Sequence, residues 1–132
     1  MNNNEIPKLN LNSSVWGNSY WRILYIIALT YSDNPTNDIK NRTKLFLENL
    51  ILPCEICQND YINNSILKYP ITDEVVSCRM NLLTWIKNIK NIEREKHNNS
   101  LLTELDIYNF FNFFDNINIK DTEYFCCELP LK

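Results

Sequence analysis

The sequence predicts an all-α fold, a four-helix bundle with an additional short C-terminal helix. Glycine occurs once in 132 residues, so sheets built on glycine-containing hairpin turns are not expected. Apolar residues recur at spacings of three and four, which is the pattern of helices that bury one face. The length suits one domain with a real core and is too short for two.

The N-terminal region predicts a tail followed by an amphipathic helix. Residues 1–12 are Asn-rich with little apolar surface, and we expect a flexible N-terminal tail. Ser13 or Ser14 is a suitable cap for a helix that runs to about Tyr31. Its apolar stripe contains Trp21, Leu24, Ala28 and Tyr31. On pattern alone, Trp21 is most simply a core residue.

A polar turn over residues 32–36 separates this helix from a second one. Thr36 can cap the second helix, which we expect to run to about Leu50. Its predicted buried residues are Ile39, Phe46, Leu47 and Leu50. The charged residues on its other face are typical of a solvated surface.

Three further helices are predicted downstream. Pro53 suits the first turn of a third helix, which we expect to continue through Ile66 and to end at Tyr69-Pro70. The longest helix is predicted from Thr72 to about Lys96, with Val76, Met80, Leu83, Ile86 and Ile89 as its stripe. An aromatic-rich helix follows over 103–115. The helical domain is thus expected over 13–115, with a C-terminal segment over 116–132 that carries Cys126 and Cys127.

Composition excludes several classes of function. The net charge of −3 argues against a nucleic-acid partner, which usually leaves a basic stripe. No apolar run of about 18 residues is present, so no transmembrane segment is expected. The polar start of the chain lacks the apolar core of a signal peptide. With one glycine, Gly-rich phosphate loops are impossible.

The chemical centre of the sequence is Cys54-Glu55-Ile56-Cys57 at the predicted start of the third helix. Two cysteines three apart lie on one face of a helix and can close a disulfide. The positive end of the helix stabilises a thiolate and lowers the pKa of its thiol. The pair is therefore a candidate redox-active site.

Three alternatives compete with the redox interpretation. A structural zinc site needs four ligands, and one such pair with a single histidine does not complete it, so no metal is expected. A thioredoxin-like domain would place the pair after a β-strand, and no alternating strand precedes Leu52. Two inert cysteines in a non-enzymatic helical interaction module are the third alternative.

A longer pattern surrounds the cysteine pair. Trp16-Gly17-Asn18-Ser19-Tyr20-Trp21, then Leu24-Tyr25-x-x-Ala28-x-x-Tyr31, and finally Pro53-Cys54-Glu55-Ile56-Cys57 follow in order. This stretch resembles the Erv/ALR family of FAD-linked sulfhydryl oxidases, whose pattern is approximately W-G-x-x-x-W-x-x-L-H-x-x-A-x-x-Y-P followed by P-C-x-x-C. The resemblance covers about residues 16–61, and the length and divergence are similar to those of the short viral members.

The chain departs from the family pattern at several positions. Tyr25 stands where the family usually has histidine. In the family's downstream W-x-x-x-x-H-N-x-V-N motif, Lys90 replaces the histidine and Arg94 the second asparagine, after Trp85 at the expected distance. His97-Asn98 repeats the histidine–asparagine step seven residues later.

The resemblance implies a set of cofactor-binding residues around FAD. Trp21 and Tyr25, one helical turn apart, could pack against a planar ring, and Gly17 would allow close approach of the cofactor. Lys87, Lys90 and Arg94 share one helix face, as binding of a pyrophosphate needs, although a solvated basic face is an equal alternative. Asn91 could bind the adenine or ribose, or be a surface asparagine. The complete predicted set is Gly17, Asn18, Trp21, Tyr25, Lys87, Lys90, Asn91 and Arg94.

The resemblance also implies an activity. A partner thiol would attack the disulfide at Cys54, and Cys57 would pass electrons to FAD and then to oxygen, with hydrogen peroxide produced. Implied partners are a reduced thiol protein, a thioredoxin-like protein or small dithiol carrier among them, and a second copy in a homodimer packed through the first two helices. Implied locations are the host cytoplasm or virion for a viral member, and otherwise the mitochondrial intermembrane space or the secretory pathway. Cys78 could pair with Cys126 or Cys127, and the choice stays open.

Overall fold

The computed structural model describes residues 5–116, with side chains as far as Phe111, and every regular element in that range is helical. The elements are α1 (Ser13–Thr30), α2 (Asn37–Glu48), α3 (Glu55–Asp60), the π-helical segment η1 (Tyr61–Ser65), α4 (Ile66–Lys68), α5 (Arg79–Lys96) and α6 (Glu104–Asn116). α3, η1 and α4 follow without a break and form the third helix of a four-helix bundle. The predicted fold class, with an additional C-terminal helix, is confirmed.

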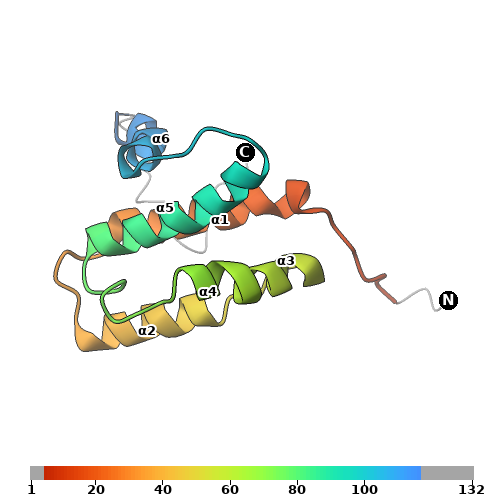
Figure 1. Ribbon diagram of the computed structural model, residues 1–132, viewed down its shortest axis with the longest axis horizontal. Coiled ribbons are helices and arrows are strands. Elements are labelled where there is room, and N and C mark those ends of the chain that lie inside the picture. The colour runs from red at the N-terminus through yellow and green to blue at the C-terminus, as the bar shows by residue number, and fades with distance from the viewer. Residues whose placement is uncertain (1–4, 117–132) are drawn as a thin grey trace.

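The bundle has two layers (Figure 1). α1 and α5 pack side by side in one layer, and α2 lies beside α3 and α4 in the other. α6 lies on the outer side of the α1–α5 layer and contacts α5. The chain therefore brings the start of α3 opposite the start of α1 and the end of α5.

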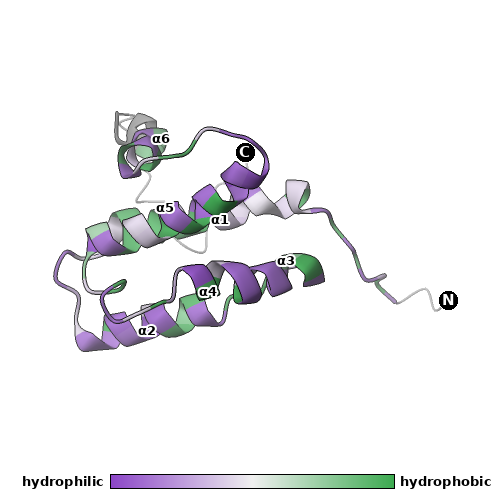
Figure 2. Cartoon of the chain, in the orientation of Figure 1, coloured by the Kyte–Doolittle hydropathy of each residue, from purple (hydrophilic) through white to green (hydrophobic). Residues whose placement is uncertain are grey.

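The core lies between the two layers. Its fully buried side chains include Ala28 from α1, Leu47 from α2, and Leu82 and Ile86 from α5. Burial of a Leu or Ile side chain contributes about 1.5–3 kcal/mol, so these contacts stabilise the packing of the two layers. The outer faces carry many of the hydrophilic residues (Figure 2).

Polar side chains begin the first two helices. Asn12 accepts a hydrogen bond from the Ser14 backbone N–H at 2.9 Å, so the cap of α1 lies one residue before the predicted Ser13. Thr36 caps α2 as predicted and accepts from the Ile39 N–H at 3.2 Å. Each such cap contributes about 1 kcal/mol to helix stability.

The predicted start of the longest helix was wrong. Residues 73–76 form turns, and α5 begins only at Arg79 after Cys78, whose backbone is extended. One local and one tertiary hydrogen bond explain the difference, because Ser77 Oγ donates to the Glu74 carbonyl and Tyr31 Oη, from the end of α1, donates to the Val76 carbonyl. Those carbonyls are thereby used outside a helical ladder.

Some apolar residues predicted to be buried are exposed instead. Ile39 and Phe46 on α2 are 42% and 45% exposed, and Met80 on α5 is 54% exposed. Leu82 and Trp85 occupy the buried face of α5 together with the correctly predicted Leu83, Ile86 and Ile89. The apolar stripe of each of these two helices is therefore wider than the face that the other layer covers.

The third helix begins later than predicted and changes geometry midway. Pro53 precedes the helix, and Cys54 is the residue that caps α3. At Tyr61 the helix widens into the π-helical η1, a rare geometry found mostly at functional sites. The chain leaves the helix at Tyr69-Pro70, as predicted. None of the helices in the described part of the chain is long and apolar enough to cross a membrane.

Candidate active site

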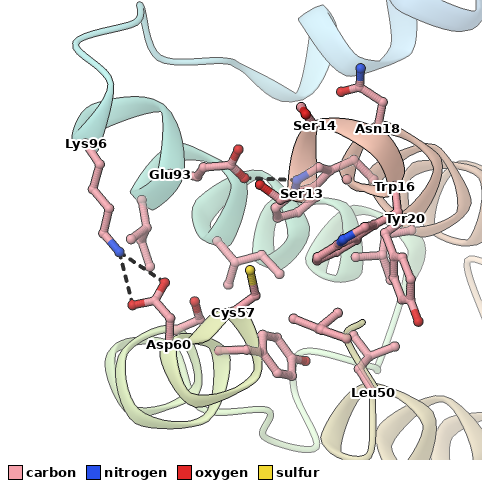
Figure 3. A pocket seen from close by; sticks show the side chains of 18 of the residues that line it. Ser13, Ser14, Trp16, Asn18, Tyr20, Leu50, Cys57, Asp60, Glu93 and Lys96 are labelled. Carbon is pink, nitrogen blue, oxygen red and sulfur yellow. Dashed lines mark hydrogen bonds and ion pairs between the residues drawn. The ribbon is translucent and has the colours of Figure 1, made fainter. Parts of the chain in front are cut away.

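A cavity of about 420 Å³ opens between α1, α3–η1 and α5 (Figure 3). Its inner wall is apolar, with Leu24, Leu50, Leu52, Ile89 and Ile92 among the lining side chains. Volumes of about 300–1,000 Å³ with apolar walls and a few polar groups are typical of cofactor and small-molecule sites.

Cys57 places its sulfur on the wall of this cavity (Figure 3). It lies on the first turn of α3, on the same face as Asp60 and Tyr61, which also line the cavity. Cys54 is partly buried as well, but it does not line the cavity and occupies the cap position of α3. Only one cysteine of the pair therefore faces the cavity.

The geometry of the helix start distinguishes the two thiols chemically. Cys54 Sγ accepts a hydrogen bond from the Cys57 backbone N–H at 3.4 Å. Interaction with the Cys57 thiol and this N–H lowers the pKa of Cys54 below its ordinary value. Burial, followed by the neighbouring Cys54, raises the pKa of Cys57 to about 11. The thiolate is thus favoured on Cys54, outside the cavity, and disfavoured on Cys57 in the cavity wall.

Trp21 forms part of the wall between α1 and α5. Its indole N–H donates to Glu93 Oε2 at 3.0 Å, and Lys90 Nζ lies 4.7 Å from the ring centroid. Lys90 also pairs with Glu93 at 3.5 Å. Glu93 therefore contacts the edge of the Trp21 ring, and Lys90 contacts its face. Burial lowers the pKa of Lys90, while Glu93 opposes that shift.

Tyr25 lies behind Trp21 rather than in the cavity lining. The two rings stack with centroids 6.1 Å apart and an interplanar angle of 27°. Burial, and next the charge of Glu93, raise the pKa of Tyr25 to about 12. Tyr25 therefore supports the wall from within the core as a neutral phenol.

The open end of the cavity is polar. Lys96 Nζ pairs with both carboxylate oxygens of Asp60, at 3.1 and 3.0 Å, and so connects the end of α5 to α3 (Figure 3). His97 lines the same end, as do Ser13 and Ser14 in the first turn of α1. A helix N-terminus beside a lysine and a histidine is suited to an anionic group.

Comparisons with known proteins agree on one family. No family model matches the chain. Over 90 residues, 67% of the chain, it is 37% identical to a probable FAD-linked sulfhydryl oxidase, R368, of Acanthamoeba polyphaga mimivirus. Over 88 residues, 63% of the chain, it is 31% identical to a putative FAD-linked sulfhydryl oxidase, 096R, of Invertebrate iridescent virus 3. The matches span 62% and 56% of those relatives' lengths.

The fold has a counterpart among solved structures. The yeast Erv1 core superposes with a TM-score of 0.68 at 21% sequence identity, covering 87% of this chain and 94% of that one. The chain belongs to the Erv/ALR family. The stretch that resembles the family pattern contains Gly17, Trp21 and Cys57, and in the structure these three residues line the same cavity.

Among the predicted contacts of this Erv/ALR chain, Gly17, Asn18 and Trp21 line the cavity. A Cβ atom built on Gly17 meets no atom within 4 Å, so there is open space beside this turn of α1. The close approach to the backbone that the sequence predicted is therefore sterically available.

The remaining predicted contacts lie elsewhere. Lys87 pairs with Glu104 at 3.4 Å. The side-chain amide of Asn91 bonds the backbone N–H and carbonyl of Leu102, and Arg94 donates to the Ser100 carbonyl at 2.5 Å. Lys87 thus connects α5 to the first residue of α6, and Asn91 and Arg94 connect it to the segment before α6. Lys90 lies over the Trp21 ring. None of these four residues lines the cavity.

Sequence reasoning missed the residues at the open end of the cavity. Lys96 lies seven residues after Ile89 and three after Glu93, on the cavity face of α5. That spacing was a usable signal, since residues at i, i+3, i+4 and i+7 share a helix face. The predicted residues Lys87, Asn91 and Arg94 follow a neighbouring stripe.

Cys78 does not line the cavity. Cys78 is partly buried at the start of α5, and in the described part of the chain it forms no disulfide. Cys126 and Cys127 lie outside the described residues, so the predicted pairings are open. The described residues contain no group of three or more His, Cys, Asp and Glu side chains that could hold a metal ion.

Proposed function

We propose that this chain is an FAD-dependent thiol oxidase that introduces disulfides into partner proteins. The observation that carries the proposal is the placement of one cysteine of the pair on the cavity wall and of the other at the exposed start of α3. Such a pair can exchange electrons with a partner protein on one side and with a bound cofactor on the other. The names of both viral relatives support the same activity.

The cavity fits FAD in size and in the distribution of its chemistry. Aromatic and apolar side chains, Trp21 and Leu24 among them, suit a flat ring system, and the open space beside Gly17 allows close approach. The polar end suits phosphate groups through Lys96, His97 and the first turn of α1. When bound, FAD would accept two electrons from the dithiol and transfer them to oxygen, with hydrogen peroxide produced.

The cysteines would carry out the exchange chemistry. A partner thiolate attacks Cys54 Sγ of the oxidised pair, the Cys54–Cys57 bond breaks, and Cys57 leaves as a thiolate. A second thiolate of the partner then attacks the partner sulfur of the mixed disulfide and releases Cys54. The partner leaves with a disulfide, and the pair holds the two electrons as a dithiol.

Partners and location follow from the same proposal. The substrate is a reduced thiol protein, with a thioredoxin-like protein or small dithiol carrier as candidates. A homodimer is supported by apolar side chains exposed on α1 and α2, namely Val15, Ile23, Ile26, Ile39, Leu45 and Phe46. The viral relatives support a viral protein acting in the host cytoplasm or the virion.

Spectroscopy and turnover test the proposal. The purified protein should be yellow, with flavin absorption, and should consume oxygen when given dithiothreitol. Cys57→Ser should abolish turnover while flavin stays bound, whereas the control Cys78→Ser should keep it. A colourless protein with one unreactive disulfide would instead favour a helical interaction module, and full activity of Cys57→Ser would remove the assigned role of the pair.

A further inference from the structure

The segment between α2 and α3 lines part of the cavity and leads directly to Cys54. Residues 50–54 have no regular secondary structure, yet Leu50 and Leu52 line the cavity and the segment ends at Cys54. The segment begins with three apolar residues, Leu50, Ile51 and Leu52, and the start of α3 carries both apolar and hydrophilic residues (Figure 2). Loops of this kind are usually the most mobile parts of a fold. A reactive thiol at the end of such a loop needs something that fixes its position.

Gln58 is bonded to this segment at three points. Its side-chain Oε1 accepts from the Leu52 backbone N–H at 2.7 Å, and its Nε2 donates to the Leu50 carbonyl at 2.9 Å. Its own backbone N–H donates to the Cys54 carbonyl at 2.9 Å, the first helical hydrogen bond of α3. The amide is partly buried, so loss of either side-chain hydrogen bond would leave a backbone group of the loop without this partner.

Gln58 also follows Cys57 directly in the chain. The bonds from Gln58 to Leu50, Leu52 and Cys54 therefore close a ring that contains both cysteines. Within that ring Cys54 has an extended backbone, with φ −151° and ψ 124°, which directs its sulfur to the Cys57 N–H. The angle at which the loop enters the helix sets this contact.

We propose that Gln58 is a positioning residue for the cysteine pair, holding the entering loop so that Cys54 Sγ stays on the Cys57 N–H. The role of Cys54 as the attacked sulfur rests on the proposed function, but the positioning itself concerns only the thiols. Without Gln58, the Cys54 sulfur would spend less time on its donor, and its thiolate would be less stabilised.

The other contacts around the site do not depend on the Gln58 side chain. Tyr20 Oη donates to the Ile51 carbonyl within the loop, and Tyr61 Oη donates to the Leu47 carbonyl in the last turn of α2, just before the loop. The charged groups near the pair are Glu55 and Asp60, with Lys96 paired to Asp60. A neutral replacement of Gln58 leaves all three in place.

The test follows the reactivity of Cys54 with pH. The full-length protein is reduced and treated with iodoacetamide from pH 5 to 10 (about the range in which thiols titrate), and peptide mass spectrometry reports the modification of Cys54. Gln58→Met keeps the length of the side chain and removes both hydrogen bonds. We expect modification at neutral pH to slow about threefold, because a less stabilised Cys54 thiolate is less populated at that pH. Asn59→Met, at the exposed neighbouring position, is the matched control and should keep the wild-type profile.

A second variant keeps the proposal testable if Gln58→Met does not fold. Gln58→Asn keeps an amide that is too short to reach both Leu50 and Leu52, and it should shift the profile in the same direction. Thermal unfolding of each variant shows whether it is folded. A folded Gln58 variant with the wild-type pH profile of Cys54 would overturn the proposal. A protein that binds no flavin would overturn the oxidase and leave this thiol measurement unaffected.

Discussion

Cys54 and Cys57 are only three residues apart, yet their surroundings give the two thiols opposite tendencies. The contact with Cys57 and its N–H lowers the pKa of Cys54, whereas burial raises that of Cys57 to about 11. The attacking species in thiol chemistry is the thiolate. At neutral pH Cys54 should therefore be the more reactive of the two.

A pH series on the reduced protein checks this asymmetry. Iodoacetamide should modify Cys54 first, and modification of Cys57 should rise only as the pH approaches about 11. The sign follows because a raised pKa keeps the Cys57 thiol protonated over the range in which Cys54 already ionises. Mass spectrometry of the two sites gives both curves. Equal rates, or earlier reaction of Cys57, would contradict the assignment.

Gly17 offers a second test at the level of one residue. Gly17→Ala should stabilise α1 by about 0.5–1 kcal/mol, because glycine is the poorer helix former. The added methyl group meets no protein atom but occupies open space beside the cavity. Affinity for FAD should fall while the free energy of unfolding rises.

The control for Gly17 lies two residues along the same helix. Ser19→Ala, at an exposed position, should leave the affinity for FAD at its wild-type value. Flavin fluorescence titration and urea unfolding give the two quantities. Unchanged FAD affinity in Gly17→Ala would show that the cofactor does not approach this turn.

At the scale of elements, α5 divides its polar residues between two tasks. Glu93 and Lys96 face the cavity, whereas Asn91 and Arg94 bond the segment that leads into α6. Sequence reasoning could predict that α5 contributes cations to a site but placed them on the adjacent face. Helical spacing alone cannot show which face meets a cavity, because that depends on how the neighbouring helices cross.

The residues at which the helices begin and end depend partly on local and partly on tertiary contacts. The Thr36 cap and the end of the third helix at Tyr69-Pro70 were predictable, since each depends on a few neighbouring residues. The late start of α5 was not predictable, because the Val76 carbonyl is taken by Tyr31 from a distant helix. The π-helical geometry of η1 likewise has no simple sequence signal.

Asn91 provides a test at this scale. Its amide makes two hydrogen bonds to Leu102, at 2.9 and 2.8 Å, and truncation leaves two partly buried backbone groups without partners. Asn91→Ala should lower the free energy of unfolding by about 2 kcal/mol, as expected for lost backbone partners. Asn88→Ala, one turn earlier on α5, is the control and should change it by less than about 0.5 kcal/mol.

The same variant tests the predicted cofactor contact. If Asn91 acts through Leu102, FAD affinity should stay near the wild-type value in protein that remains folded. A large loss of affinity with unchanged stability would return Asn91 to the set of cofactor-binding residues.

At the scale of the whole molecule, the exposed apolar residues of α1 and α2 need an explanation. Ile39 and Phe46 fit the apolar stripe of α2, and the sequence therefore predicted that they are buried, yet both are largely exposed in the single chain. An apolar stripe shows that a face is covered, but it cannot show whether the same chain or another copy covers it. Contact with a second copy would reconcile the pattern with the exposure.

Phe46→Glu tests that explanation. A carboxylate placed in an apolar interface loses its hydration without a partner, at a cost of several kcal/mol. At micromolar concentration the wild type should sediment as a dimer and Phe46→Glu as a monomer. Because Phe46 is already 45% exposed in the single chain, the fold of the subunit should survive.

Leu105→Glu gives the matched control, since Leu105 is exposed on α6 rather than on the first two helices. It introduces the same charge and should leave the dimer intact. A dimer that persists in Phe46→Glu would show that α2 is not part of the interface. A monomeric wild type would contradict the proposed homodimer, because the exposed apolar side chains of α1 and α2 would then stay in contact with water.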